Sequence, residues 1–242
     1  MKLFAKIDKY MKCSGSKNKI AIIHSDLLAF GKKSLRYKYN LIDKIFEEAK
    51  IETLCLPSFS YYQKINVFNR KDAAFKMGSL PNFAIKNDIG YRINNPIHSY
   101  LIIGKDKFGF KKSLINKSFG QNTVFDKFYK SKALWCNLGC DVNKGFTIFH
   151  HAEVLASVKY RKWIKISKKV EINKKIKKIK YKYYARKSGV KINFKKGVNF
   201  LIKQKVIFKD QINNKDIFYG NSKKIIDELL VKLKKDDFFL VK

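Results

Sequence analysis

Two short apolar runs with an amphipathic stretch between them occupy residues 19–59, and this order constrains the fold more than any other feature of the chain. Residues 19–23 end in a polar His-Ser-Asp loop, as a buried strand does, and residues 51–59 predict a second strand that ends at a Pro-Ser pair. Between them, helical spacing is shown by Leu41, Ile42, Ile45, Phe46 and Ala49. The three segments predict a βαβ unit with parallel strands.

Two later apolar runs, Tyr100 to Ile103 and Leu134 to Leu138, each end at a glycine and predict further strands of a mixed or parallel sheet. Active sites in such sheets lie at strand ends. Near the C-terminus we expect a helix with Ser222 as its N-cap, and its apolar stripe consists of Ile225, Ile226, Leu229, Leu230 and Leu233. Because no repeat, flexible linker or low-complexity tail interrupts the chain, residues 1–242 are expected to form one domain.

The chain is strongly basic, with 54 Lys plus Arg against 19 Asp plus Glu and a formal net charge of +35. Its 45% of apolar residues still suffices for a full hydrophobic core. Only five basic residues are arginines, and the abundant Lys, Phe, Tyr, Ile and Asn all have A/T-rich codons. Part of the charge therefore follows genome composition, and a nucleic-acid reader would use more Arg, whose planar fork matches phosphates and guanine edges.

Residues 158–196 hold 17 Lys or Arg and a single acid, Glu171. Apolar residues alternate with lysines at 163–166 and 176–183, which predicts strands with one solvated lysine face. An anion-binding face is the alternative, because the interleaved Tyr and Trp side chains could stack bases in a non-catalytic polyanion-binding module. The aromatic residues are Tyr160, Trp163, Tyr181, Tyr183 and Tyr184. No recognised nucleic-acid motif accompanies them, so we do not expect a nucleic-acid partner.

Cysteine usage predicts a reducing, cytoplasmic setting, because four cysteines in 242 residues, none at Cys-x-x-Cys spacing, are not a disulfide framework. Charges at Lys2, Lys6, Asp8 and Lys9 interrupt any apolar run at the N-terminus, so no signal peptide is expected. No apolar run reaches the roughly 18 residues that a membrane span requires.

The histidines are the most informative titratable residues. The four are His24, His98, His150 and His151, and each lies in a polar cluster beside a predicted strand end. Thr147, His150 and Glu153 are spaced i, i+3 and i+6, so on a helical turn the carboxylate could orient the imidazole while the hydroxyl contacts substrate. The alternative is an ordinary helix start.

Several familiar sites are absent from the sequence. There is no His-Glu-x-x-His or Cys-x-x-Cys zinc signature, and the adjacent His150 and His151 would diverge on a helix, so no metal is expected. The chain has no P-loop, no Gly-rich dinucleotide fingerprint and no Gly-x-Ser-x-Gly elbow. Direct group transfer assisted by a base is the simplest chemistry that remains.

Six ordered blocks resemble the aminoglycoside 3-N-acetyltransferase family. The first three are His24-Ser25-Asp26-Leu27-Leu28-Ala29-Phe30-Gly31, Thr53-Leu54-Cys55-Leu56-Pro57-Ser58-Phe59-Ser60 and Gly78-Ser79-Leu80-Pro81. The later three are Arg92 to Ser99, Phe119 to Thr123, and Leu138-Gly139 followed by Thr147 to Glu153 and Tyr160-Arg161. The resemblance covers residues 19–161.

This resemblance implies a three-layer α/β/α sandwich with a mixed central sheet, followed here by the lysine-rich region, which is expected to contain β-strands. It implies transfer of an acetyl group from acetyl-CoA to a small-molecule amine. His150 would be the general base, Glu153 would orient it, and Thr147 and His98 would line the reaction centre. The pantetheine arm and phosphates of CoA would be held by His24, Ser25, Asp26, Leu27 and Ser99.

The chain departs from the family pattern at five positions. Asp26 and Ile93 each stand where the family pattern has Ser. Asn82 stands where it has Glu, Asn95 where it has His, and Asn69 where it has Asp. Asp26 would repel CoA phosphates unless it points away, and we expect it to cap its own loop. Two acidic positions have become amides in a chain of charge +35, which would repel a polycationic aminoglycoside. We therefore expect an anionic amino sugar, such as a nucleotide-linked one, with aminoglycoside acetylation in antibiotic resistance as the alternative.

Overall fold

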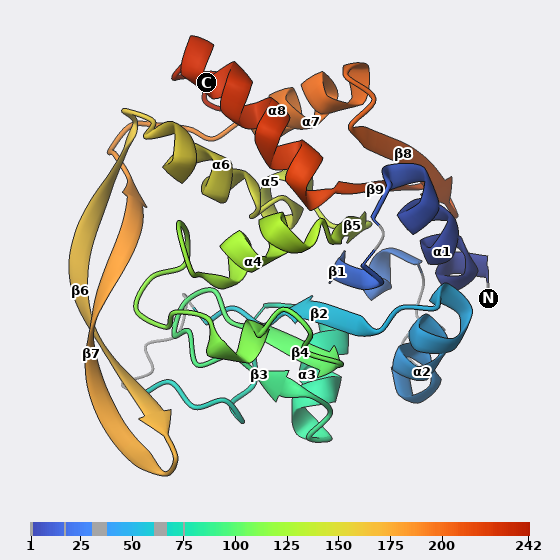
Figure 1. Cartoon of the computed structure of the whole chain (residues 1–242), viewed down its shortest axis with the longest axis horizontal. Helices are drawn as coiled ribbons and strands as arrows, with labels where there is room; N and C mark the ends of the chain where they lie inside the picture. The colour runs from blue at the N-terminus through green and yellow to red at the C-terminus, as the bar shows by residue number, and fades with distance from the viewer. Residues whose placement is uncertain (1, 17, 31–37, 61–66, 75) are drawn as a thin grey trace.

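A parallel trio of strands forms the middle of the molecule. The computed structural model describes residues 2–16, 18–30, 38–60, 67–74 and 76–242 (Figure 1). Strand β1 (Ile20–Ser25) pairs in parallel with β2 (Thr53–Pro57) on one side and with β5 (Leu134–Leu138) on the other. Helix α2 (Lys38–Ala49) connects β1 to β2, so the expected βαβ unit is confirmed.

Antiparallel strands extend this trio at both edges into a mixed sheet. Beyond β2 come β4 (Tyr100–Gly104) and the short β3 (Tyr91–Arg92), and beyond β5 come β9 (Lys215–Asn221) and β8 (Ile207–Ile212). The order among the described residues is β3-β4-β2-β1-β5-β9-β8. The predicted strands at 100–103 and 134–138 are thus both present.

Successive residues of the central strands enter two different hydrophobic cores, because side chains alternate across a sheet. From β1, Ile20 and Ile22 face one core, and Ala21 and Ile23 face the other. The second core is covered by α1 (Lys2–Ser14), α2 and α3 (Ser79–Lys86). The first is covered by α4 (Val124–Ser131), α6 (Phe149–Ala156), α7 (Phe194–Lys203) and α8 (Ser222–Lys235). The expected three-layer sandwich is confirmed (Figure 1).

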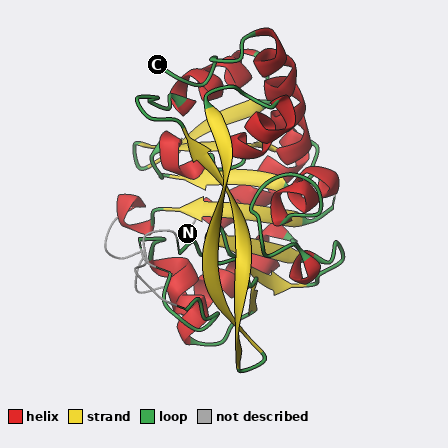
Figure 2. Cartoon of the chain, turned by 90° about the vertical axis from the view of Figure 1, so that its left-hand side faces the viewer, coloured by secondary structure: helices red, strands yellow, loops and turns green. Residues whose placement is uncertain are grey.

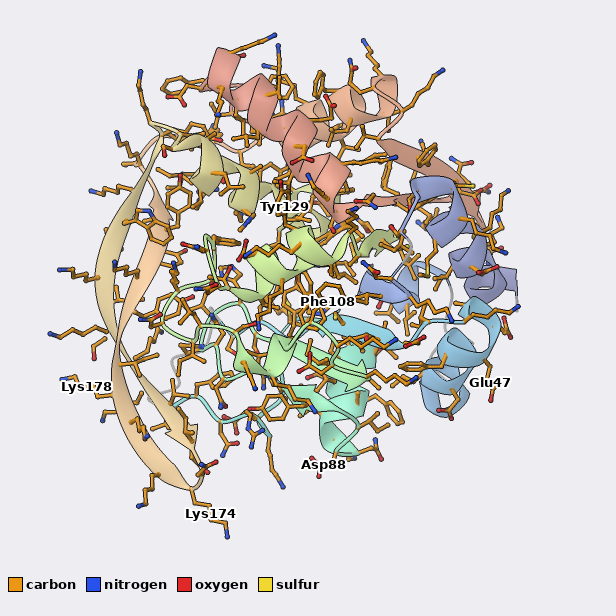
Figure 3. The ribbon with its side chains drawn as sticks, viewed as in Figure 1. Glu47, Asp88, Phe108, Tyr129, Lys174 and Lys178 are labelled. Carbon is orange, nitrogen blue, oxygen red and sulfur yellow. The ribbon has the colours of Figure 1, made fainter. Side chains whose placement is uncertain are left out.

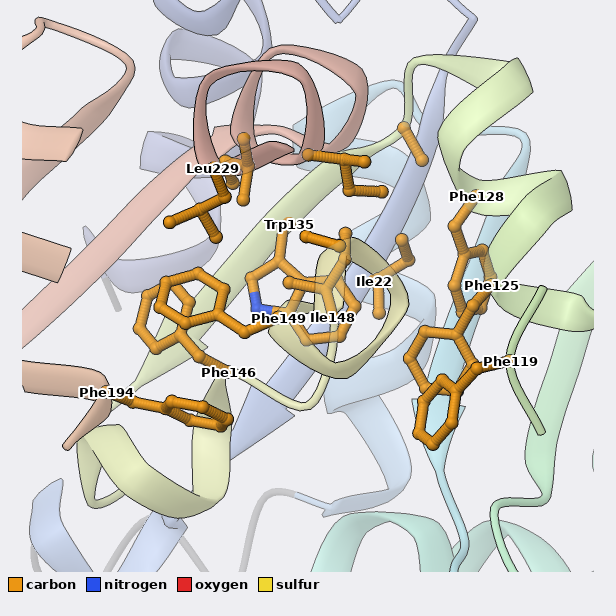
Figure 4. Close-up of a cluster of buried hydrophobic side chains, with 14 of the residues drawn as sticks. Ile22, Phe119, Phe125, Phe128, Trp135, Phe146, Ile148, Phe149, Phe194 and Leu229 are labelled. Atoms are coloured by element: carbon orange, nitrogen blue, oxygen red, sulfur yellow. The ribbon is translucent and has the colours of Figure 1, made fainter. Parts of the chain in front are cut away.

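Aromatic side chains dominate the first core (Figure 4). Trp135 is fully buried at its centre, and its indole Nε1 donates to the Gly145 carbonyl over 3.1 Å, at the end of the short helix α5 (Val142–Gly145). Phe125 and Phe128 lie on one side of it, and Phe149 lies on the other. Each such buried ring contributes about 1.5–3 kcal/mol relative to an exposed one. This packing fixes α4 and α6 against the sheet.

Residues 161–186 form a separate two-stranded ribbon of β6 (Arg161–Ile172) and β7 (Lys175–Arg186). The ribbon is strongly twisted and runs across one side of the layered body (Figure 2). It contacts the body near its turn end through Val170, which bridges to Phe68, and closer to its start through Lys182, which bridges to Lys117. The lysine-rich stretch is therefore placed beside the strand ends rather than in the central sheet.

Two details differ from the sequence analysis. The N-cap of α8 is Asn221, whose Oδ1 accepts from the backbone N–H groups of Lys223 and Lys224, so the prediction of Ser222 is wrong. Ser222 is the first helical residue, and its hydroxyl donates to the Phe128 carbonyl over 2.6 Å. Helix α1 was not predicted, although Ile7, Tyr10 and Met11 have helical spacing and are buried.

All four cysteines are free thiols. No helix in the described part of the chain is long and apolar enough to cross a membrane.

Candidate active site

Most of the candidate residues gather at the carboxyl edge of the parallel trio, where active sites of such sheets form. His24 and Ser25 end β1, and Leu138 ends β5. His98 and Ser99 immediately precede the antiparallel β4 and so reach the same edge. Gly78 also approaches this edge: its φ is 87°, and a Cβ there would lie 3.2 Å from the Ser25 carbonyl oxygen. That close approach explains a glycine at this position.

Helix α6 holds the predicted base and its carboxylate on adjacent turns. Nδ1 of His150 lies 2.7 Å from Oε2 of Glu153, one helical turn further on. Thr147 lies just before the helix, and its carbonyl accepts the backbone N–H of His150 over 3.1 Å. The Glu153 side chain is completely buried, whereas His150 keeps 21% of its side chain exposed. A reactant can therefore reach the imidazole but not the carboxylate.

The buried Glu153 carboxylate has a partner for each oxygen. Oε1 accepts from the Tyr160 hydroxyl over 2.7 Å, and Nε of Arg161 lies 2.7 Å from Oε2. The Tyr184 hydroxyl donates to the Glu153 backbone carbonyl over 3.2 Å. Burying an unpaired carboxylate would be very unfavourable, and these contacts compensate for its lost hydration. They also fix the carboxylate that orients His150.

The contacts of Nδ1 determine which imidazole nitrogen is free to act. A terminal guanidinium nitrogen of Arg161 lies 3.0 Å from Nδ1, and the Glu153 carboxylate lies nearer, at 2.7 Å. We assign the imidazole proton to Nδ1, because two lone pairs at 2.7 Å would repel, and Nδ1 then donates to Glu153. The lone pair of neutral His150 then lies on Nε2, the nitrogen that can accept a proton from a substrate.

The charges around His150 keep it in the basic, unprotonated form. Burial lowers the pKa of His150 below its usual 6.5, and the positive charge of Arg161 lowers it further, while Glu153 opposes the shift. For Glu153, burial alone would raise the pKa of the carboxyl, but His150, Arg161 and the Tyr160 hydroxyl outweigh it and lower that pKa. At neutral pH the pair is a neutral imidazole on a carboxylate, the combination that a general base requires.

His98 lies at the end of a buried hydrogen-bond network. Its Nδ1 lies 2.6 Å from the Ser118 hydroxyl, which contacts the Tyr181 hydroxyl in a short hydrogen bond. Tyr181 also donates to Oδ1 of Asn95 over 3.2 Å, and the same oxygen accepts the backbone N–H of His98 over 2.9 Å. Burial lowers the pKa of His98 well below its usual value, as do the charges of His150 and Arg161. Neither Ser118 nor a role for Tyr181 in this network was predicted, because no local pattern in the sequence relates the two residues.

Two aromatic rings pack between the predicted histidines at the carboxyl edge of the parallel strands. Phe119 packs against both His98 and His150, with ring centroids 5.0 and 5.5 Å away. Phe59, near the end of the second sequence block, packs against His98 at 5.0 Å and His24 at 6.1 Å. The structure thus brings His24, His98 and His150 into one apolar-walled region, with Phe119 packed against both His98 and His150.

The five residues expected to hold CoA surround the ends of β1 and β4, but three have buried side chains. His24 shares a hydrogen bond of 3.1 Å with the Tyr100 hydroxyl, and burial lowers its pKa to about 3. The Ser99 hydroxyl donates to the Ile93 carbonyl, and Leu27 joins the second core. Ser25 is half-buried and Asp26 is exposed, and Oδ1 of Asp26 accepts the Leu28 backbone N–H over 3.2 Å. Asp26 therefore makes the expected loop cap.

Where Asn stands in place of the family residue, its side chain makes hydrogen bonds that need both the oxygen and the NH₂ of an amide. Asn82 accepts the Ala74 backbone N–H through Oδ1 and donates through Nδ2 to the carbonyls of Ala74 and Gly78. Asn95 likewise accepts from Tyr181 and two backbone N–H groups while Nδ2 donates to the Lys117 carbonyl. A carboxylate could not make the donor contacts of Asn82, and Asn69, at the other acidic position of the family pattern, likewise donates through Nδ2 to Oε2 of Glu171 over 2.9 Å. The changes therefore adapt the local loops.

His151 lies on a different side of α6 from His150 and Glu153, because adjacent helical residues are about 100° apart. It is fully buried, its Nδ1 accepts the Gly120 backbone N–H over 3.3 Å, and burial lowers its pKa to about 4. These contacts are those of a core residue. Within the described ranges, no group of three or more His, Cys, Asp or Glu side chains is arranged to hold a metal ion.

The chain matches the family model of aminoglycoside 3-N-acetyltransferase over residues 47–234, which confirms the resemblance. Among solved structures, YokD protein from Bacillus subtilis is similar with a TM-score of 0.74 and 16% identity, over 97% of this chain and 94% of that one. AAC-IIIb in a binary complex with CoASH is similar with a TM-score of 0.74 and 14% sequence identity, over 96% of each chain. AAC-VIa bound to sisomicin is similar with a TM-score of 0.71 and 12% sequence identity, over 96% of this chain and 97% of that one. No curated protein sequence matches the chain.

Proposed function

Because the chain belongs to the aminoglycoside 3-N-acetyltransferase family of acetyl-CoA-dependent acyltransferases, we propose that it transfers an acetyl group from acetyl-CoA to an amine of an aminoglycoside. The observation that carries the catalytic part of this proposal is the contact of 2.7 Å between His150 Nδ1 and the buried Glu153 carboxylate. That contact leaves the basic nitrogen Nε2 on the partly exposed imidazole.

In the proposed reaction the neutral amine attacks the thioester carbonyl of acetyl-CoA. Nε2 of His150 accepts the amine proton as the N–C bond forms. The C–S bond then breaks, and the proton passes from His150 to the departing sulfur, so that CoA leaves as the thiol. Glu153 holds the imidazole in one orientation and stabilises the imidazolium that forms between these steps. The products are the N-acetylated acceptor and CoA.

The donor is proposed to approach past the ends of β1 and β4. His24, Leu27 and Ser99 would form the buried support of that wall, because their side chains are engaged in the interior. Ser25 and Asp26 would face the donor more directly, since they are the less buried members of the set. Asp26 already accepts the Leu28 backbone N–H, and this hydrogen bond partly offsets the negative charge of the carboxylate. His98 and Thr147 are proposed to line the acetyl group.

The family match favours an aminoglycoside over the anionic amino sugar that the net charge suggested, and it favours an enzyme over a non-catalytic polyanion-binding module. The amides at positions 82 and 69 no longer support the anionic acceptor, because both are used in local contacts: Asn82 with the backbone of Ala74, and Asn69 with Glu171 and the Lys71 backbone N–H. The charge of +35 remains unfavourable for the encounter with a polycation. We therefore expect a KM for aminoglycosides that decreases as salt screens this repulsion.

The acceptor is tested by measuring thiol release from acetyl-CoA with aminoglycosides, free amino sugars and nucleotide-linked amino sugars at matched ionic strength. We expect thiol release with at least one aminoglycoside and none with the sugars. Turnover restricted to nucleotide-linked sugars would overturn the proposed acceptor but keep the acetyl transfer. Failure to bind acetyl-CoA in a direct titration would contradict the acyltransferase itself.

The base is tested with His150→Ala, for which we expect a turnover reduced by roughly two to four powers of ten and a nearly unchanged affinity for CoA. The adjacent His151→Asn is a matched control, because Asn can keep the acceptor contact to Gly120. That variant should lose stability but retain turnover in the folded protein. Equal turnover of His150→Ala and wild type would remove His150 from the mechanism.

A further inference from the structure

Three lysines from three neighbouring chain segments lie side by side. Lys165 of β6 is the direct cross-strand partner of Lys182 of β7, and Lys182 forms a parallel β-bridge with Lys117. The backbone N–H of Lys182 also donates to the Asn116 carbonyl over 2.8 Å, which fixes the register of this third segment. Paired residues point to the same face, with Cα atoms about 4.5–5.5 Å apart. The three lysines therefore form one row, with their side chains on the same face.

No carboxylate compensates this row in the part of the chain that the structure describes. The ion pairs found there involve other lysines, and Glu171, the one acidic residue of the ribbon, contacts Asn69 through Oε2. Like charges directly opposite one another destabilise a strand pair. A bound anion would remove this repulsion.

The row borders a cavity of about 360 Å³ that also has an apolar wall. The lining is Lys117, Phe119, Gly120, Val154, Trp163, Ile164, Lys165 and Lys182. Trp163 is 43% exposed and packs on Tyr184 with ring centroids 4.7 Å apart, so one face of the indole is supported while the side chain remains accessible. Lysines beside an accessible aromatic ring suit a ligand that combines a phosphate with an apolar or planar part.

The cavity adjoins the catalytic residues without including them. Phe119 lines it and also packs against His150, and Val154 follows Glu153 in α6. We propose that the row of Lys117, Lys182 and Lys165 is a binding site for a phosphate group, with Trp163 contacting the part of the ligand that bears it. The remaining ribbon lysines differ from this row. Lys174 and Lys178, for example, point away from the body into solvent (Figure 3).

Inorganic pyrophosphate is a suitable probe, because its binding requires neither an acceptor nor turnover. We expect saturable binding in calorimetry, and a fluorescence change from Trp163, since Trp135 is fully buried in the core. The test variant is Lys117→Gln combined with Lys165→Gln and Lys182→Gln. The control, Lys175→Gln with Lys177→Gln and Lys178→Gln, removes the same charge from exposed positions of the same ribbon outside the cavity.

The test variant should bind pyrophosphate at least tenfold more weakly than wild type, whereas the control should stay within about twofold. The melting temperature of the test variant is expected to equal or exceed that of wild type, because the cross-strand repulsion is relieved. Equal weakening in both variants would show general attraction to a basic surface and overturn the site. Absence of saturable binding in wild type would overturn it as well.

The phosphate can belong to the donor or to another ligand, and competition distinguishes the two. If CoA displaces pyrophosphate and 3′-dephospho-CoA does not, the site holds the 3′-phosphate of the donor. If saturating CoA leaves pyrophosphate bound, the phosphate belongs to a separate ligand. Because these are binding measurements, failure of the proposed aminoglycoside activity would leave the result intact.

Discussion

Glu153 makes the shortest polar contact of His150, the proposed base. Replacing it by Gln keeps the size but lets the amide donate to His150 Nδ1, which would place the imidazole proton on Nε2 and remove the base. We expect Glu153→Gln to reduce kcat by roughly 10² to 10⁴-fold, measured as thiol release at saturating acetyl-CoA. Tyr160→Phe is the control, because it removes only the contact to the other carboxylate oxygen, Oε1. Unchanged turnover in Glu153→Gln would contradict the assigned tautomer.

Arg161 is the charged neighbour that most lowers the pKa of His150. Burial is the largest cause of the lowered pKa of His150, and the positive charge of Arg161 comes next. Removing that charge in Arg161→Gln should raise the pKa, so the loss of kcat/KM on acidification should begin at a higher pH than in wild type. Arg186→Gln removes a weaker influence of the same sign and should shift the profile less. An acid limb that moves to lower pH would contradict this assignment.

The contacts that could be predicted from the sequence are those between residues that are close together in the chain. The i, i+3 spacing of His150 and Glu153 predicts their contact, because one helical turn brings them together. Tyr160 and Arg161 follow soon after α6 and were found through the family blocks. Ser118 and Tyr181 are 63 positions apart, and no local pattern relates them. Their contact depends on where the ribbon docks.

The β6–β7 ribbon packs beside the site, and replacing one of its side chains, Tyr181, tests how much this packing contributes to stability. Tyr181 is fully buried and links the ribbon to Ser118 and Asn95. Tyr181→Phe leaves these two buried groups with one partner fewer, and we expect the free energy of unfolding to fall by about 1–2 kcal/mol in urea titrations. Tyr183→Phe, half-buried two positions further on, should change it by less than about 0.5 kcal/mol. Equal effects in the two variants would contradict the docking role.

The elements that periodicity predicted are those whose pairing is local. The βαβ unit brings β1 and β2 together across one helix, and its apolar runs are visible because both faces are buried. By contrast, β9 pairs with β5 from far along the chain, and its antiparallel addition has no local signal. The ribbon follows from alternation at 163–166 and 176–183, yet its contacts with Phe68 and Lys117 are tertiary.

For the whole molecule, the net charge was a weaker guide to the acceptor than the ordered family blocks. The charge of +35 lies on exposed lysines, many of them in residues 158–196, whereas the proposed catalytic residues lie in a small, mostly buried region. A mean surface field influences how fast a charged ligand arrives. The chemistry depends instead on a few short contacts between buried side chains, which total charge does not describe.

All four histidines are buried enough for their pKa values to be lowered, and this couples the stability of the whole molecule to pH. The pKa is about 3 for His24 and about 4 for His151, and the pKa values of His98 and His150 are also below the usual 6.5. Below about pH 6.5 the unfolded chain binds protons that the folded chain does not. The free energy of unfolding must therefore fall as the pH falls, by about 1.4 kcal/mol per pH unit for each such histidine.

We expect His24 and His151 alone to remove roughly 3 kcal/mol between about pH 7.5 and pH 5.5, a large part of a typical total of 5–15 kcal/mol. Carboxyl groups contribute little in this window, because the unfolded chain protonates them only near about pH 4.5 and below. Urea titrations at both pH values measure the change, and His151→Asn should lose about 1.4 kcal/mol less than wild type. A stability that stays constant across this pH range would mean that these imidazoles are protonated in the folded protein, contrary to their burial.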